Sequence, residues 1–234
     1  MVREQDVTVE NICCRVVISD EARALLAAKA AGRVIVAYLR ENRTEDLSMA
    51  RYGVEDMEAA DERYLERVAR RELGLPWLIG ESERLTLREF TAEDGKHVYP
   101  EPEDKEADKV FYDEERLKAY IRGQYGFFEY GLWAVVRKAD GRLLGKAGLT
   151  GWDPEGGMEL AYHIFTPYRR QGYGEEACRI VLSYASQEYG CPFYALVEPG
   201  NKASPGLLRK LGFRFTGQEC NGSRHRYCLG ARCL

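Results

Sequence analysis

The sequence has no long apolar run. No segment approaches the length of a membrane-spanning helix, and the opening residues, MVREQDVTVENICC, lack the apolar core of a secretory signal peptide. These absences predict a cytoplasmic protein that does not enter a membrane. Basic residues are not in excess either, since the net charge is −4, and this argues against nucleic acid as a partner.

Metal and disulfide patterns are also missing. The seven cysteines form an odd set without a C-x-x-C pair, and the three histidines, His97, His163 and His225, stand at no spacing typical of zinc ligands. We therefore expect reduced cysteines that mostly pack in the interior, and no bound metal.

The most informative stretch is 159–176, which reads ELAYHIFTPYRRQGYGEE. Residues 159–165 alternate and are rich in aromatic and β-branched side chains, which predicts a strand, and Pro167 ends it. A helix is expected to begin after the glycines, at Glu175. Amide groups between this strand and helix would converge on the positive end of the helix dipole and form an anion site. The residues of this predicted pyrophosphate cradle are Arg169, Arg170, Gln171, Gly172, Tyr173 and Gly174.

On these residues alone, an ordinary strand-to-helix turn with solvated arginines remains an alternative. The stretch is not a nucleotide P-loop, because no G-K-[ST] follows the glycines. It is not the dinucleotide fingerprint either, because Ala177 occupies the position of the third glycine.

The spacing Arg169-x-x-Gly172-x-Gly174 resembles the acyl-CoA signature of the GNAT superfamily of N-acetyltransferases. The surrounding text looks most like the branch that acetylates ribosomal-protein alanine. A second motif beginning at Asn201 and ending in LLRKLGF, and the opening ERLTLREFTAED, are similar to the same branch. Together the three motifs extend the resemblance over residues 82–230.

The resemblance implies an α/β GNAT fold over residues 76–234, with a mixed, mostly antiparallel sheet that splays at its central strands and is flanked by helices. It implies acetyl-CoA as co-substrate and an amine as acceptor, a protein N-terminus or a small molecule. The amine would attack the thioester directly in a ternary complex. The alternative is a non-catalytic module that only binds acyl-CoA.

The resemblance also assigns roles to single residues. The pantetheine arm would pair with the central strand at Ile164 and Thr166, and a backbone N–H from Phe165 or near it would polarise the thioester carbonyl. Asn201 would bind the pantetheine amide or the start of its own helix. Ser204 would lie next to the thiol sulfur of the cofactor.

Catalysis needs a base and a group that helps the thiolate leave. Glu159 is the expected base, with a solvent-facing glutamate or a carboxylate that only binds the cationic substrate as alternatives. Ser204 is the expected partner of the leaving thiolate. Many GNAT enzymes place a tyrosine four residues further on, where this chain has Leu208, which cannot donate a hydrogen bond.

The first 75 residues predict a separate small domain. A strand ending at Ser19, a helix that begins at Asp20 and ends before Gly32, and a strand over 33–39 form a βαβ unit with a parallel sheet. A third strand near 51–54 and a helix over 57–73 follow. Asp20 is expected to cap the first helix.

This block resembles the closing third of haloacid dehalogenase-like hydrolases, chiefly in AAKAAG at 27–32. Ala24 replaces the second metal-binding acid, and no Asp-x-Asp nucleophile follows an apolar strand. Without a nucleophilic carboxylate no phospho-enzyme can form. The block is therefore expected to be a Rossmann-like remnant without phosphatase activity, and to serve packing, homodimer formation or substrate choice.

The remaining elements of the second domain follow from periodicity and turn residues. Helices are expected over 109–125, 174–189 and 201–211, and strands over 84–90, 132–138, 142–149, 192–197, 213–218 and 225–229.

Overall fold

The computed structural model describes residues 1–42, 44–101, 108–218 and 223–230. The chain forms two compact units, Met1–Trp77 and Leu78–Leu234. Among the described residues, no helix is both long and apolar enough to cross a lipid bilayer. Cys220 and Cys233 lie outside the described residues.

The first unit contains a four-stranded sheet in the order β1-β2-β3-β4. Strands β2, β3 and β4 are mutually parallel and confirm the expected βαβ unit, whereas β1 is antiparallel to β2. The elements are β1 (Val2–Val9), β2 (Ile12–Ser19), α1 (Ala22–Ala30), β3 (Val34–Tyr38), β4 (Tyr52–Val54) and α2 (Glu62–Glu72). The expectation of a purely parallel sheet is wrong, because it missed β1. Glu10 and Asn11 join β1 to β2 with φ of 48° and 69°, as a tight hairpin turn requires.

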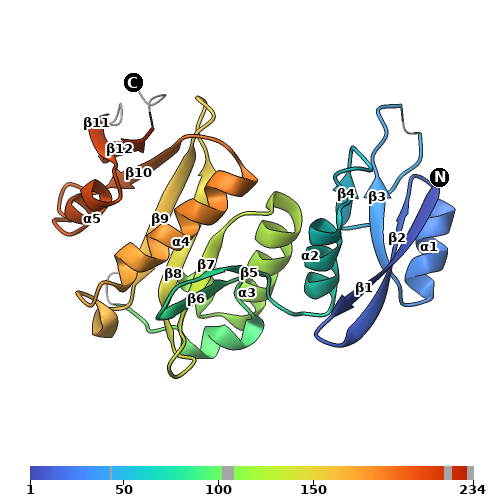
Figure 1. Ribbon diagram of the computed structural model, residues 1–234, viewed down its shortest axis with the longest axis horizontal. Helices are drawn as coiled ribbons and strands as arrows, with labels where there is room; N and C mark the ends of the chain where they lie inside the picture. The colour runs from blue at the N-terminus through green and yellow to red at the C-terminus, as the bar shows by residue number, and fades with distance from the viewer. Residues whose placement is uncertain (43, 102–107, 219–222, 231–234) are drawn as a thin grey trace. The chain divides into compact units, whose positions relative to one another are not determined.

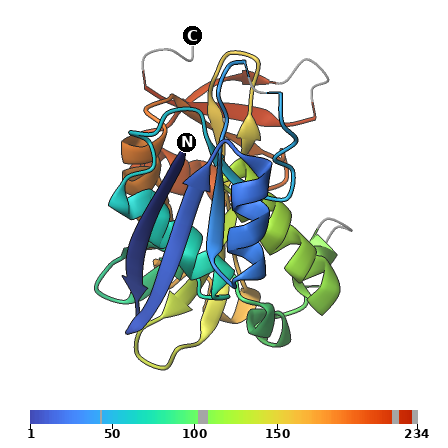
Figure 2. The same cartoon turned by 90° about the vertical axis from the view of Figure 1, so that its right-hand side faces the viewer.

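Helices cover both faces of this sheet: Figure 2 shows α1 in front of it, and α2 lies on the other side (Figure 1). On one face, strand residues such as Ile18 and Val36 pack with Leu65 and Val68 of α2. On the other face, Val17 and Ile35 pack with Leu25 and Ala28 of α1. Burial on both faces explains why β2 and β3 read as continuous apolar runs rather than as alternating patterns.

The start of α1 differs from the expectation. Its N-cap is Glu21, without a side-chain hydrogen bond, and Asp20 does not cap the helix. The carboxylate of Asp20 instead forms ion pairs with Arg40 at 3.0 Å and with the amino group of Met1. Gly32 ends the helix at φ 70°, as expected for a residue in the left-handed region.

The second unit is built on an eight-stranded sheet in the order β11-β12-β10-β9-β8-β7-β6-β5 (Figure 1). Every neighbouring pair is antiparallel except β9 and β10. The strands are β5 (Leu78–Glu81), β6 (Leu85–Arg88), β7 (Leu132–Arg137), β8 (Leu143–Trp152), β9 (Met158–Ile164), β10 (Phe193–Val197), β11 (Arg214–Gln218) and β12 (His225–Leu229). Two α-helices follow the central strands, α4 (Tyr173–Glu188) and α5 (Ser204–Lys210).

The segment before β7 is more divided than the single expected helix. It comprises the 3-10 turn η2 (Asp108–Phe111), α3 (Glu114–Tyr120) and the π-helical turn η3 (Ile121–Phe128). Asp113 caps α3 by accepting a hydrogen bond from the Arg116 N–H at 2.9 Å, which fixes a new helix start inside the predicted span.

Strand β9 presents two different faces. The side chain of Ile164 faces α4, because a Cβ on Gly174 would lie 3.6 Å from it. Residues two apart share a face, so Tyr162 also faces α4, whereas Glu159 and His163 face the opposite side. On that opposite side, Lys146 of β8 lies 4.2 Å from the ring of Phe111 in η2. The two sides of the sheet are therefore covered by different layers, α4 on one and η2 with its following helix on the other.

Candidate functional site: a gap between two strands beside a helix start

Strands β9 and β10 separate after a short contact. Their parallel pairing consists of Met158 with Phe193 and Glu159 with Tyr194. Beyond Glu159, β9 continues to Ile164 while it pairs only with β8. The sheet is therefore splayed at its central strands, as expected, and a gap opens along β9.

The backbone groups that face this gap follow from the alternation of the ladder. The N–H of Phe165 donates to the carbonyl of Leu144 in β8 at 2.9 Å, whereas the N–H of Met158 donates to Pro192 O at 3.0 Å, towards β10. The N–H groups of Tyr162 and Ile164 therefore point into the gap. The N–H of Phe165 itself is engaged in the β8 ladder, so of the N–H groups expected at or near Phe165 it is that of Ile164 that faces the gap.

The predicted cradle lies between β9 and α4. Arg170 and Gly172 both take left-handed backbone conformations, with φ of 60° and 85°. The first helical hydrogen bond runs from Glu176 N–H to Gly172 O at 3.1 Å, so the amides of residues 173–175 have no acceptor within the helix. Such a turn presents several N–H groups to one point at the positive end of the α4 dipole. The side chains of Arg169, Arg170 and Gln171 are exposed around it.

Arg84 and Glu176 form a pair that contacts the cradle, and no local pattern in the sequence predicted it. The Arg84 Nε donates to Glu176 Oε2 at 2.8 Å, and its Nη1 donates to the carbonyl of Gln171 at 3.1 Å. The guanidinium also lies 4.5 Å from the ring centre of Tyr173. Burial alone would raise the pKa of Glu176, but hydrogen bonds from Ser82 and Arg84 outweigh it and the pKa lies below its usual value.

Thr166, Arg169 and the carbonyl of Ile164 lie next to the gap, and each is in contact with a neighbouring side chain. Glu101 accepts hydrogen bonds from the N–H and the hydroxyl of Thr166, each at 2.6 Å, and lies 3.5 Å from Arg169 Nη2. Arg169 Nε in turn donates to Ile164 O at 2.8 Å. A pantetheine arm that pairs with Ile164 and Thr166 would have to displace these contacts. Glu101 was missed from sequence because it lies 65 residues away from Thr166.

Asn201 and Ser204 are brought together at the start of α5. The side-chain oxygen of Asn201 accepts from the Ser204 N–H at 3.1 Å, and its amide nitrogen donates to Ser204 Oγ at 3.0 Å. Asn201 therefore binds the start of its own helix. Leu208, one turn further on, is fully buried.

Glu159 lies where β9 and β10 separate. Its Oε2 accepts a hydrogen bond from the hydroxyl of Thr150 in β8 at 3.0 Å, and its Cα partner in β10 is Tyr194, at the last pair before the gap. The carboxylate points to the face opposite α4, whereas Ser204 belongs to the helix that follows β10 on the chain. The carboxylate of Glu159 on β9 and the hydroxyl of Ser204 on α5 thus come from different elements around the gap.

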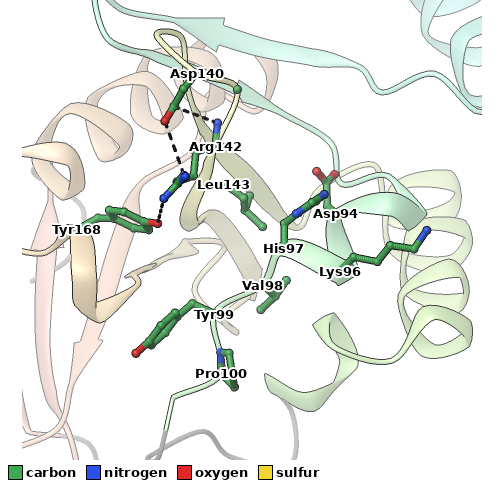
Figure 3. Close-up of a pocket in the computed structure, with 11 residues that line it drawn as sticks. Asp94, Lys96, His97, Val98, Tyr99, Pro100, Asp140, Arg142, Leu143 and Tyr168 are labelled. Atoms are coloured by element: carbon green, nitrogen blue, oxygen red, sulfur yellow. Dashed lines mark hydrogen bonds and ion pairs between the residues drawn. The ribbon is translucent and has the colours of Figure 1, made fainter.

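A hollow of about 430 Å³ lies beside Tyr168, the residue before Arg169 (Figure 3). Its acidic groups are already paired: Asp94 with Arg88 at 2.7 Å and Asp140 with Arg137 at 2.6 Å. The hollow is lined by Asp94, Lys96, His97, Val98, Tyr99, Pro100, Asp140, Gly141, Arg142, Leu143 and Tyr168. None of the residues predicted to bind the cofactor lines it.

The cysteines near the site are poorly suited to nucleophilic attack. Cys178 of α4 is fully buried, and burial raises the pKa of its thiol far above its usual value. Burial also raises the pKa of Cys191. Among the described residues, no group of three or more His, Cys, Asp and Glu side chains is arranged to hold a metal ion.

The sequence matches the family described as "Acetyltransferase (GNAT) domain" over residues 84–214. This match spans more than half of the chain, and the chain belongs to this family.

Two curated proteins illustrate the sequence similarity. The Bacillus subtilis protein YkkB is 34% identical over 89 residues, which are 36% of this chain and 51% of that protein. The L-methionine sulfoximine/L-methionine sulfone acetyltransferase of Pseudomonas aeruginosa is 32% identical over 88 residues, with coverage of 36% and 51%. The chain thus spans about half the length of the curated relatives it matches.

Solved structures share the fold. A GNAT-family acetyltransferase from Bordetella pertussis superposes with a TM-score of 0.54 at 19% identity, covering 65% of this chain and 98% of that one. A ribosomal-protein-S5-alanine acetyltransferase from Vibrio fischeri gives a TM-score of 0.52 at 17% identity, covering 66% and 94%. At identities this low, the superpositions show a shared fold alone.

Proposed function

We propose that the protein is an acetyl-CoA-dependent N-acetyltransferase, in which a primary amine attacks the bound thioester directly. The observation that carries this proposal is the turn at residues 170–175, whose amides lack helical acceptors beside a gap in the sheet. A diphosphate at the turn and a pantetheine arm in the gap would use both features at once.

The cofactor would be held from two sides. The amides of residues 172–175, with Arg169, Arg170 and Gln171 around them, would bind the diphosphate, because guanidinium groups and helix N-termini both favour phosphate oxygens. The Ile164 backbone would pair with the pantetheine once Arg169 turns outward to the diphosphate. Glu101 would then leave Thr166, since its carboxylate would be repelled by the incoming anion.

The acceptor would approach from the face of Glu159. This carboxylate would take the proton that the amine nitrogen releases as it attacks the carbonyl, and the N–H of Tyr162 would stabilise the developing oxyanion. The chemistry selects a primary amine in its neutral form. The α-amino group of a small amino-acid derivative and the N-terminus of a protein both meet this requirement.

A thiol-release assay with acetyl-CoA and two acceptor panels tests the proposal. One panel holds small amines, including methionine sulfoximine, and the other holds peptides that begin with alanine or serine. Calorimetry of acetyl-CoA binding accompanies the assay. Thiol release that depends on the amine supports the proposed reaction, binding without turnover on either panel would favour a module that only binds acyl-CoA, and the absence of binding would contradict both.

The first unit is proposed to be a Rossmann-like remnant over residues 1–75 without phosphatase activity. Asp20 is occupied by its ion pair with Arg40, and Ala24 offers no ligand for a metal. Hydrolysis of p-nitrophenyl phosphate in the presence of Mg²⁺ would contradict this proposal. Sedimentation of the full chain tests whether it forms a homodimer.

A further inference from the structure

The hydroxyl of Tyr162 is a buried polar group that the predicted machinery did not use. Its Oη is inaccessible to solvent and forms no hydrogen bond of ordinary geometry with the described residues, although the Ser204 hydroxyl interacts with it. Leaving a buried hydroxyl unsatisfied is costly, and native proteins rarely do so without a reason. A ligand atom that accepts a hydrogen bond at this point would satisfy it.

The position of Tyr162 connects the hydroxyl to the gap. The residue lies on β9 beyond the last pair with β10, and its backbone N–H points into the gap. Its side chain shares the α4 face with Ile164. The Ser204 hydroxyl lies near the phenol and opposes the rise that burial imposes on the pKa of Tyr162, which reaches about 12.

Two other groups define the surroundings of this hydroxyl. Cys178 of α4 faces it from the helix side, and its own raised pKa keeps that thiol neutral. Ser204 already accepts a hydrogen bond from Asn201, so its own hydroxyl proton is available for another acceptor. The hydroxyls of Tyr162 and Ser204 are therefore two hydrogen-bond donors beside the gap. The neutral thiol of Cys178 offers them no anionic acceptor.

We propose that the hydroxyl of Tyr162, together with that of Ser204, binds the coenzyme A sulfur and stabilises the thiolate as the carbon–sulfur bond breaks. The inference rests on the proposed acetyl transfer. Tyr162 on β9 would supply the hydrogen-bond donor that Leu208 on α5 cannot provide.

The reaction balances without proton loss from the phenol. The amine nitrogen forms a bond to the carbonyl carbon, the carbon–sulfur bond breaks with its electron pair on sulfur, and the proton released by nitrogen goes to Glu159. A thiol has an ordinary pKa of about 8.5, well below that of Tyr162, so the phenol keeps its proton and donates a hydrogen bond. The thiolate takes its proton from solvent after release.

The test compares free CoA with acetyl-CoA, which has no ionisable thiol. The ratio of their dissociation constants, measured by calorimetry against pH, reports the thiol pKa of bound CoA. A hydrogen bond to a charged group corresponds to roughly 1 to 2 pKa units, so this thiol pKa should be higher by that amount in Tyr162→Phe than in the wild type. The kcat for thiol release should fall by about 10- to 100-fold, while the affinity for acetyl-CoA is unchanged.

Thermal unfolding provides the matched control. Tyr162→Phe removes a buried hydroxyl that forms no well-aligned hydrogen bond and should leave the unfolding midpoint equal or higher. Tyr120→Phe removes a hydroxyl that accepts from Leu132 N–H at 2.7 Å, so it should lower the midpoint and leave the thiol pKa unchanged.

Each contrary result has a distinct meaning. An equal thiol pKa in wild type and Tyr162→Phe, or a lowered midpoint in that variant, would overturn the role of Tyr162 while acetyl transfer stands. No binding of either ligand to the wild type would overturn the proposed function and this inference together.

Discussion

Replacing Arg84 with alanine should weaken the cradle more than the fold. Arg84 joins the start of β6 to the cradle through Glu176 and the Gln171 carbonyl. The Arg84 side chain is 44% exposed and the Glu176 side chain 18%, so the pair is intermediate between a surface and a buried ion pair. With the stacking on Tyr173 included, we expect the free energy of unfolding to fall by roughly 1–2 kcal/mol.

The effect on binding follows from the same contacts. Without Arg84 the turn must be ordered by the ligand. The carboxylate of Glu176 keeps its hydrogen bond from Ser82 but loses its counter-charge near the expected diphosphate. If 1–2 kcal/mol is transferred to the binding step, the dissociation constant for acetyl-CoA rises by roughly 5- to 30-fold. Calorimetry measures the constant, and urea unfolding measures the stability.

Arg33→Ala is the matched control. Arg33 is 37% exposed and pairs with Glu4 at 2.9 Å in the first unit, so its loss should cost a few tenths of a kcal/mol at most. Its acetyl-CoA affinity should equal that of the wild type. An unchanged affinity in Arg84→Ala despite lost stability would refute the idea that the Arg84–Glu176 pair orders the cradle.

The base, the competing carboxylate, the glycine turn and the acid-sensitive ion pair can each be perturbed separately. Glu159→Gln should lower kcat by about 100-fold at unchanged acetyl-CoA affinity, and a normal kcat in steady-state assays would exclude the base role. Glu101→Ala should tighten acetyl-CoA binding severalfold in calorimetry, because it frees Thr166 and Arg169; weaker binding would contradict the competition. Gly172→Ala places a Cβ at φ 85° and 3.2 Å from Arg84 Nη2, so urea unfolding should show a loss of about 1 kcal/mol, and equal stability would argue against the strained turn. The pKa of Glu176 is lower in the folded than in the unfolded protein. Ionised Glu176 therefore stabilises the fold above the unfolded pKa of about 4.3, and this stabilisation is lost as pH falls through the folded pKa. The wild type should lose more stability than Arg84→Ala over that acid range in urea unfolding, and equal losses would count against a stabilising Arg84–Glu176 pair.

Local signals in the sequence located the cradle well. The alternation before Pro167 and the two glycines at 172 and 174 predicted where β9 ends and where α4 begins, within two residues. These features depend on near neighbours in the chain, which a pattern can report.

Contacts between distant segments were not predictable in the same way. Arg84 reaches Glu176 across 92 residues and Glu101 reaches Thr166 across 65, and no local pattern encodes either contact. Strand β1 was missed because most of its side chains are exposed or half-buried, so its apolar alternation is weak. The buried hydroxyl of Tyr162 is likewise visible only once the helices are placed on the sheet.

A crystal structure with bound acetyl-CoA tests the central claim most directly. If the cradle binds the cofactor, diphosphate oxygens will lie within about 2.7–3.2 Å of the amide nitrogens of residues 172–175. Glu101 will have left Thr166, and the thioester will lie between β9 and β10. A diphosphate bound elsewhere, with this turn and the Glu101 contacts unchanged, would contradict this claim.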